Sequence, residues 1–244
     1  MTFFDGLIIL AGALAGGFVS GLAGFGTALT TVGIWLHALD PITSATLTLV
    51  CSVMGQLQTI PAIWREIHPG RVLPFIIPGL IGVPAGLWSL TYVDPQVFKF
   101  GVGLFLVGFS IFMLVWRGMP AVAWGGRWAD GVTGFLGGVL GGMAGLSGAL
   151  PTIWASLRGW SKDQKRSVFQ VFNLTILTAA LVAHALSGRV NGSLALPVAI
   201  ALPGTLAGAW LGFRAYERLS DRNFNDLIMG VLLFSGAILL LSLR

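Results

Sequence analysis

Long apolar stretches, separated by short polar breaks, make up most of this chain. Six of them have the length of about 20 residues that a helix needs to cross the hydrocarbon core of a bilayer. They lie near residues 42–63, 72–91, 97–116, 167–187, 193–213 and 224–243. Charged residues gather at the breaks, as in Trp64-Arg65-Glu66 and Ser161-Lys162-Asp163. The pattern predicts an all-α integral membrane protein.

Two longer Gly-rich stretches, near residues 3–36 and 129–157, match each other in sequence. Residues 16–29 read GGFVSGLAGFGTAL and residues 137–150 read GGVLGGMAGLSGAL, with seven identities in fourteen positions at an offset of 121 residues. We therefore predict a single membrane domain, residues 1–244, built from two homologous halves, residues 1–119 and 120–244. Internal repeats of this kind are typical of secondary transporters.

The length of the Gly-rich stretches predicts that each is a broken or re-entrant helix. Residues 3–36 would form a helix of about 50 Å at 1.5 Å per residue, which is too long for one crossing and too short for two. A hairpin of two half-helices with its glycine tip inside the membrane fits this length. It would be followed by three transmembrane helices in each half.

Charge also favours the hairpin arrangement. If each hairpin returns to its starting side, 11 of the 14 Lys and Arg residues lie on one face, and Lys99, Arg189 and Arg244 on the other. The positive-inside rule expects such an asymmetry. The expected topology has six full spans, both termini outside, and two inverted repeats.

Composition excludes several classes of protein. Only 9% of the residues are charged, whereas a soluble domain has about a quarter. The net charge of +5 is explained by cytoplasmic loops of a membrane protein, so no nucleic-acid binding is expected. Cys51 is the only cysteine and the three histidines are isolated, so neither a metal site nor a cofactor is expected. Ser147 and His184 are the only candidate nucleophile and base, with no supporting acid, so no enzyme is predicted.

The polar residues expected at membrane depth are neutral, and they suit a small anion. The second limb of a hairpin begins at the tip, where its free N–H groups and positive dipole end point into the membrane. Glycine lets these amides approach an oxyanion closely, and Thr27 and Ser147 would add hydroxyl donors. The predicted substrate-binding residues are Gly24, Phe25, Gly26, Thr27, Ser52, Gln56, Gly145, Leu146, Ser147, Gly148, Gln170 and Asn173.

Other readings apply to part of this pattern. The buried amides of Gln56, Gln170 and Asn173 could equally hold helices together. Glycines outside the tips are read as helix-packing contacts, which are common in lipid; these are Gly82, Gly86, Gly204, Gly208 and Gly212. Tryptophans near the ends of segments are read as an interfacial belt, with Trp35, Trp64, Trp116, Trp124, Trp128 and Trp160 as its members.

The spacing of Gly17, Gly21, Gly24 and Gly26, repeated over residues 137–150, resembles the TauE/SafE family, the sulfite-exporter-like or TSUP group. The resemblance implies a multi-pass protein of the bacterial inner membrane that transports sulfite, thiosulfate, sulfoacetate or a related organosulfonate, and it suggests a homodimer. The first turn lacks the proline of the family's glycine turn, whereas the second keeps Pro151. The alternative is a transporter or channel for another small anion, such as a carboxylate.

Overall fold

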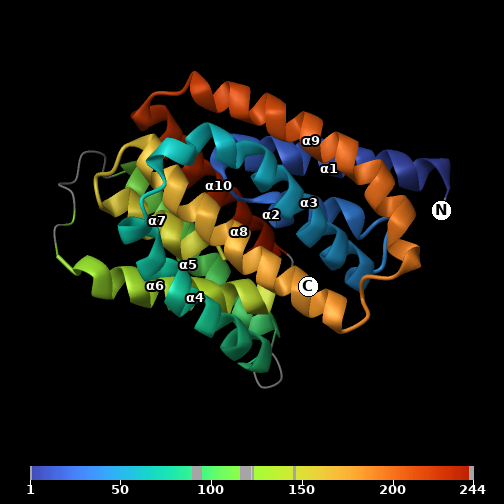
Figure 1. Ribbon diagram of the computed structural model, residues 1–244, viewed down its shortest axis with the longest axis horizontal. Helices are drawn as coiled ribbons and strands as arrows, with labels where there is room; N and C mark the ends of the chain where they lie inside the picture. The colour runs from blue at the N-terminus through green and yellow to red at the C-terminus, as the bar shows by residue number, and fades with distance from the viewer. Residues whose placement is uncertain (1, 90–94, 116–121, 123, 145–146, 242–244) are drawn as a thin grey trace.

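Helices make up almost all of the chain that the structure describes. The computed structural model describes residues 2–89, 95–115, 122, 124–144 and 147–241. Within these residues there are two short 3₁₀ turns, no strand, and ten α-helices (Figure 1): α1 Phe3–Ala23, α2 Thr27–Trp35, α3 Pro41–Ile63, α4 Pro69–Ser89, α5 Pro95–Val115, α6 Gly126–Ala144, α7 Ala149–Leu157, α8 Lys162–Leu186, α9 Ala195–Glu217 and α10 Asp221–Leu241. The prediction of an all-α fold is confirmed.

Five of the described helices are long and apolar enough to cross a bilayer. These helices are α1, α3, α4, α8 and α9, and their candidate spans cover Phe3–Ala23, Ile42–Glu66, Pro69–Gly86, Lys162–Leu186 and Gly192–Glu217. The predicted spans near 97–116 and 224–243 coincide with α5, which has a shorter apolar segment over Phe100–Val115, and with α10. The chain is therefore a multi-pass membrane protein by the length and composition of its helices.

Each Gly-rich stretch is a broken helix, but its two limbs are unequal. The first breaks only at Gly24 and Gly26, whose φ angles of 83° and 95° lie in the left-handed region that favours glycine. The limb before the break, α1, has 21 residues and the limb after it, α2, has 9, so the expectation of two half-helices was wrong. Earlier glycines, such as Gly16 and Gly17, stay inside α1 because a helix tolerates them.

The short helices fold back along the long ones. Gly12 of α1 lies against Trp35 and Gly16 against Thr31, so α2 runs antiparallel to α1. In the second half α6 and α7 have 19 and 9 residues and pack in the same way, with Gly137 against Pro151. The re-entrant placement of these helices in a bilayer stays a prediction. The predicted site residues Gly145 and Leu146 lie outside the described residues.

The closest helix contacts are made between the halves. Helix α1 packs on α9, and α6 packs on α4. The two pairs lie at opposite sides of the molecule in Figure 1. A Cβ on Gly17 would overlap the backbone of Thr205, and a Cβ on Gly138 would overlap that of Gly79. The facing glycines Gly82, Gly86, Gly208 and Gly212 meet the backbones of α6 and α1 in the same way. This confirms the packing role predicted for them.

Helices α3 and α8 form the centre of the bundle and run antiparallel. The Oγ1 atom of Thr46 lies 2.9 Å from Nδ1 of His184, whereas Gln170 bonds Thr59 near the other end of the pair. Each helix begins at a side-chain cap, Asp40 for α3 and Ser161 for α8. Hydrogen bonds from Thr43 hold the pKa of the Asp40 carboxyl below its usual value.

The glycine contact between α4 and α6 predicts a steric effect. Gly138→Ala should lower the free energy of unfolding by about 1–3 kcal/mol, because its methyl group overlaps the backbone of Gly79 and forces the helices apart. Gly108→Ala on α5 is the matched control, since no atom lies within 4 Å of its added Cβ. Unfolding of the purified protein in detergent measures both. Equal stabilities for the two variants would contradict the packing argument.

Candidate functional site

The two breaks in the Gly-rich helices meet at a small cavity between α3 and α8. The centre of a water-sized sphere can occupy about 30 Å³ of this cavity. By the same measure, one water molecule needs only about 10–15 Å³. The first tip contributes Phe25, Gly26, Thr27 and Ala28, the second Ser147, Gly148 and Ala149, and the surrounding helices Ser52, Gln56, Leu106, Asn173, Leu177 and Leu232. The cavity therefore has room for a small polar group.

Eight of the twelve residues predicted for the site line this cavity: Phe25, Gly26, Thr27, Ser52, Gln56, Ser147, Gly148 and Asn173. Gly24 is buried beside the cavity, against Phe169 and the aliphatic part of Arg166. Gln170 is also buried and contacts the backbone of Gln56 rather than the cavity. Residues far apart in the chain are brought together here because the tips of both halves end at the same place.

Backbone N–H groups are available at the cavity from two helices. Helix α2 begins at Thr27 and α7 at Ala149, and both residues line the cavity. The first N–H groups of a helix have no partner within it, and the positive end of the helix dipole lies at the same point. Both helix ends therefore favour a negatively charged group in the cavity.

Side-chain amides add further donors. The Ser147 hydroxyl donates to Oδ1 of Asn173 over 2.6 Å, which fixes that amide with its NH₂ group beside Gly148. Among the described residues, Oε1 of buried Gln56 has no hydrogen-bond partner. Because an amide can exchange its oxygen and nitrogen positions by rotation, Gln56 can present its NH₂ group to a ligand.

The polar contacts of Ser147 do not assemble a catalytic pair. Its hydroxyl donates to Asn173, whereas His184 contacts Thr46 and, at 3.3 Å, Arg189. His184 therefore holds α8 to α3.

Sequence reasoning missed Arg166, a fully buried cation next to this site. Its guanidinium donates to Oε1 of Gln170 over 2.9 Å and to the carbonyls of Leu22 and Gly21 over 3.1 and 2.6 Å. It also lies 4.1 Å from the ring centroid of Tyr216. Its position in the first two turns of α8 suggested an exposed helix end. The spacing of Arg166, Gln170 and Asn173 on one helical face was the available signal.

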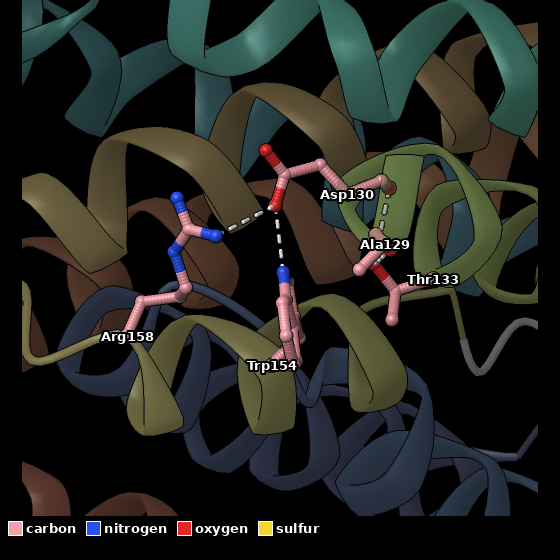
Figure 2. A network of polar contacts seen from close by, with 5 residues as sticks. All are labelled: Ala129, Asp130, Thr133, Trp154 and Arg158. Atoms are coloured by element: carbon pink, nitrogen blue, oxygen red, sulfur yellow. Dashed lines mark hydrogen bonds and ion pairs between the residues drawn. The ribbon is translucent and has the colours of Figure 1, made fainter. Parts of the chain in front are cut away.

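Buried tryptophans pin the end of each short helix to its long partner. In the first half Nε1 of Trp35 donates to the carbonyl of Ile9 over 3.0 Å. In the second half Nε1 of Trp154 donates to the buried carboxylate of Asp130 over 2.6 Å, and the Arg158 guanidinium lies 4.0 Å from the same oxygen (Figure 2). Trp35 is fully buried, so its prediction as an interfacial anchor was wrong.

Apolar helices of spanning length, with two broken helices that meet at a small cavity, define a multi-pass membrane protein of the transporter type. A family model described as sulfite exporter TauE/SafE matches residues 8–239, nearly the whole chain. The chain belongs to the TauE/SafE family, as its glycine pattern predicted, and the family is one of membrane transporters. No curated protein matches the chain.

The contact between Trp154 and Asp130 predicts a specific cost. Trp154→Phe should lower the free energy of unfolding by about 1–3 kcal/mol, because it leaves a buried carboxylate without its indole donor. Trp128→Phe, the same change at a 79% exposed side chain, should have little effect. Unfolding of both variants in one detergent gives the comparison. A similar loss in both would show that the buried hydrogen bond is not the cause.

Proposed function

We propose that this protein carries a small anion across the membrane and binds it in the cavity between the two glycine tips. The observation that carries the proposal is the convergence of α2 and α7 at one small cavity, each with its N-terminal end toward it. Two helix N-termini from opposite halves would hold the ligand without a formal charge in the first layer of contacts. Binding would then be moderate and release possible, as transport requires.

The side chains around the cavity support an anionic ligand. None of its described lining residues is acidic, and hydroxyl and amide groups come from Ser52, Gln56, Ser147 and Asn173. Arg166 places a positive charge near the cavity without lining it. Its guanidinium donates to Gln170, and Gln170 donates to the backbone of Gln56. In a site with little water, such charge and dipoles act more strongly than in bulk solvent.

The substrate class that we propose is a sulfur oxyanion or organosulfonate, such as sulfite, thiosulfate or sulfoacetate. The description of the matching family as sulfite exporters supports this choice. The hydroxyl, amide and backbone donors in the lining of the cavity suit the three or more oxygens of these anions better than the two of a carboxylate.

For the topology, we propose two inverted repeats, residues 1–119 and 120–244, with re-entrant tips. The antiparallel α3 and α8 support this, since they hold the same place in their halves. So do α5 and α10, where Gly103 meets Leu240 and Leu106 meets Gly236. The end of the bundle that carries Arg65, Arg71, Arg158 and Lys162, which we call the basic end, would then face the cytoplasm of a bacterial cell.

A panel of anions tests the proposed site. Sulfite, thiosulfate, sulfoacetate, sulfate, acetate and chloride would each be added to purified protein, and the thermal midpoint measured. We expect stabilisation by a sulfur anion. Gly148→Ala should raise the half-maximal concentration about tenfold, or about 1.4 kcal/mol, because its Cβ would lie 2.6 Å from Nδ2 of Asn173.

The matched control is Gly230→Ala on α10, where no atom lies within 4 Å of the added Cβ. This variant should respond to the anion as the wild type does. Stabilisation by none of the six anions would overturn the proposal, and so would an unchanged half-maximal concentration in Gly148→Ala.

A further inference from the structure

A chain of polar contacts leads from the cavity toward the basic end of the bundle. Gln170 donates to Thr59 Oγ1 over 2.7 Å and to the carbonyl of Gln56 over 3.3 Å, and it accepts from Nε of Arg166 over 2.9 Å. Gln56 itself lines the cavity. We call Gln56, Thr59, Gln170 and Arg166 the polar ladder. These residues lie on the facing sides of α3 and α8, one helical turn apart.

The polar ladder ends beneath a polar cleft at the basic end. This cleft has a volume of about 370 Å³ and is lined by Ala62, Ile63, Arg65, Glu66, Lys162, Asp163, Phe213, Tyr216 and Glu217. The guanidinium of Arg166 lies over the rings of Tyr216 and Phe213, with 4.1 and 5.0 Å to the ring centroids. The Tyr216 hydroxyl in turn donates to Asp163. Arg166 therefore separates the cleft from the inner part of the ladder.

The equivalent positions on the other side of the cavity are apolar. At the offset of 121 residues that relates Ser52 to Asn173, the four ladder residues Arg166, Gln170, Gln56 and Thr59 correspond to Ala45, Leu49, Leu177 and Ala180. Leu49, Val53 and Leu177 form a buried cluster, which we call the apolar plug, and Ala180 packs against it. The two sides of the cavity thus differ in chemistry although their backbones correspond.

The Arg166 guanidinium makes no ion pair among the described residues, and the opposite charge that acts on it is the Asp163 carboxylate beyond Tyr216. Its three hydrogen bonds all go to neutral acceptors, namely two carbonyls and one amide oxygen. A buried cation without a directly paired opposite charge is unfavourable in a low dielectric. An anion that passes between the cleft and the cavity would supply that charge, while the apolar plug offers nothing comparable on the other side.

We propose that the polar ladder is the path by which the anion moves between the basic end and the cavity, and that Arg166 selects for negative charge on it. This inference rests on the proposed function. Arg166 acts here as a selectivity residue, and small oxyanions are the ligands that it admits. The apolar plug keeps the cavity closed toward the opposite end.

Labelling of single cysteines at equivalent ladder and plug positions tests the path. In a Cys51→Ser background, Thr59→Cys and Ala180→Cys place a thiol on the two sides of the cavity at corresponding positions. A thiol reagent that carries a sulfonate is added to the basic end in sealed vesicles. The Thr59→Cys thiol should react about tenfold faster or more, because the buried Arg166 cation attracts an anion on its side of the cavity, whereas the apolar plug carries no charge. Equal rates, faster reaction at Ala180→Cys, or reaction at neither position would overturn the path.

Replacement of Arg166 tests its role in selection. In Thr59→Cys protein, the reaction rate of the sulfonate reagent is divided by that of a cationic reagent of the same size. Arg166→Met should lower this ratio about tenfold, and Arg166→Lys should keep most of it, because the charge remains. Lys165→Met is the control, since it removes a neighbouring cation that contacts Asn225 rather than the ladder. A merely structural role in holding the carbonyls of Gly21 and Leu22 would alter both rates alike and leave the ratio unchanged.

Anion-dependent thermal stabilisation of the same proteins separates this inference from the proposed function. If anions stabilise the wild type but the reagent ratio is the same with and without Arg166, the selectivity role is wrong and the cavity proposal stands. If no anion stabilises the wild type, the proposed function fails first and the ladder has no substrate to select.

Discussion

The close approach of glycine backbones between α1 and α9, and between α4 and α6, is the contact on which the rest of the structure depends. In both pairs a Cβ at the central glycines would overlap the facing backbone. In lipid there is little hydrophobic drive to bring helices together, so such close packing supplies much of their association. Because each pair joins one half to the other, neither half can bury its glycine face alone. Because α1 pairs with α9 and α6 pairs with α4, the two glycine tips lie together at the cavity.

Several weaker contacts then fix the tips. The short helices are pinned at their far ends by Trp35 and Trp154, one to a backbone carbonyl and the other to a carboxylate. Arg166 binds the last carbonyls of α1, which have no partner within the helix. Because Trp35 holds the far end of α2 and Arg166 holds the end of α1 just before it, the first N–H groups of α2 stay at the cavity. The site is therefore a consequence of how the broken helices are anchored, and few of the anchoring residues touch the cavity themselves.

The repeat in the sequence was enough to predict which residues come together at the cavity. It did not predict where each Gly-rich helix breaks or how long its two limbs are. Eight of the predicted residues line one cavity because the duplicated glycine motif marks both tips. The unequal limbs were missed because glycine in a helix and glycine at a break look the same in sequence, and only the positive φ of Gly24 and Gly26 separates them. Arg166 was missed for another reason. Its position close to the start of α8 suggested that the side chain is exposed to solvent. Packing of α1 and α9 around the start of α8 buries it instead.

The two halves that we propose differ in their side chains along the path that we propose. Ser52 and Asn173 stay polar at the centre, but Arg166 and Gln170 correspond to Ala45 and Leu49 at the offset of 121 residues. A symmetric path would present an anion with the same barrier on each side. On this proposal, one buried cation would lower the barrier from the basic end alone, so the rate at which the anion approaches the cavity would differ between the two faces. The net direction of movement would still follow the electrochemical gradient. A fixed charge that lowers one barrier speeds entry and exit over that barrier by the same factor.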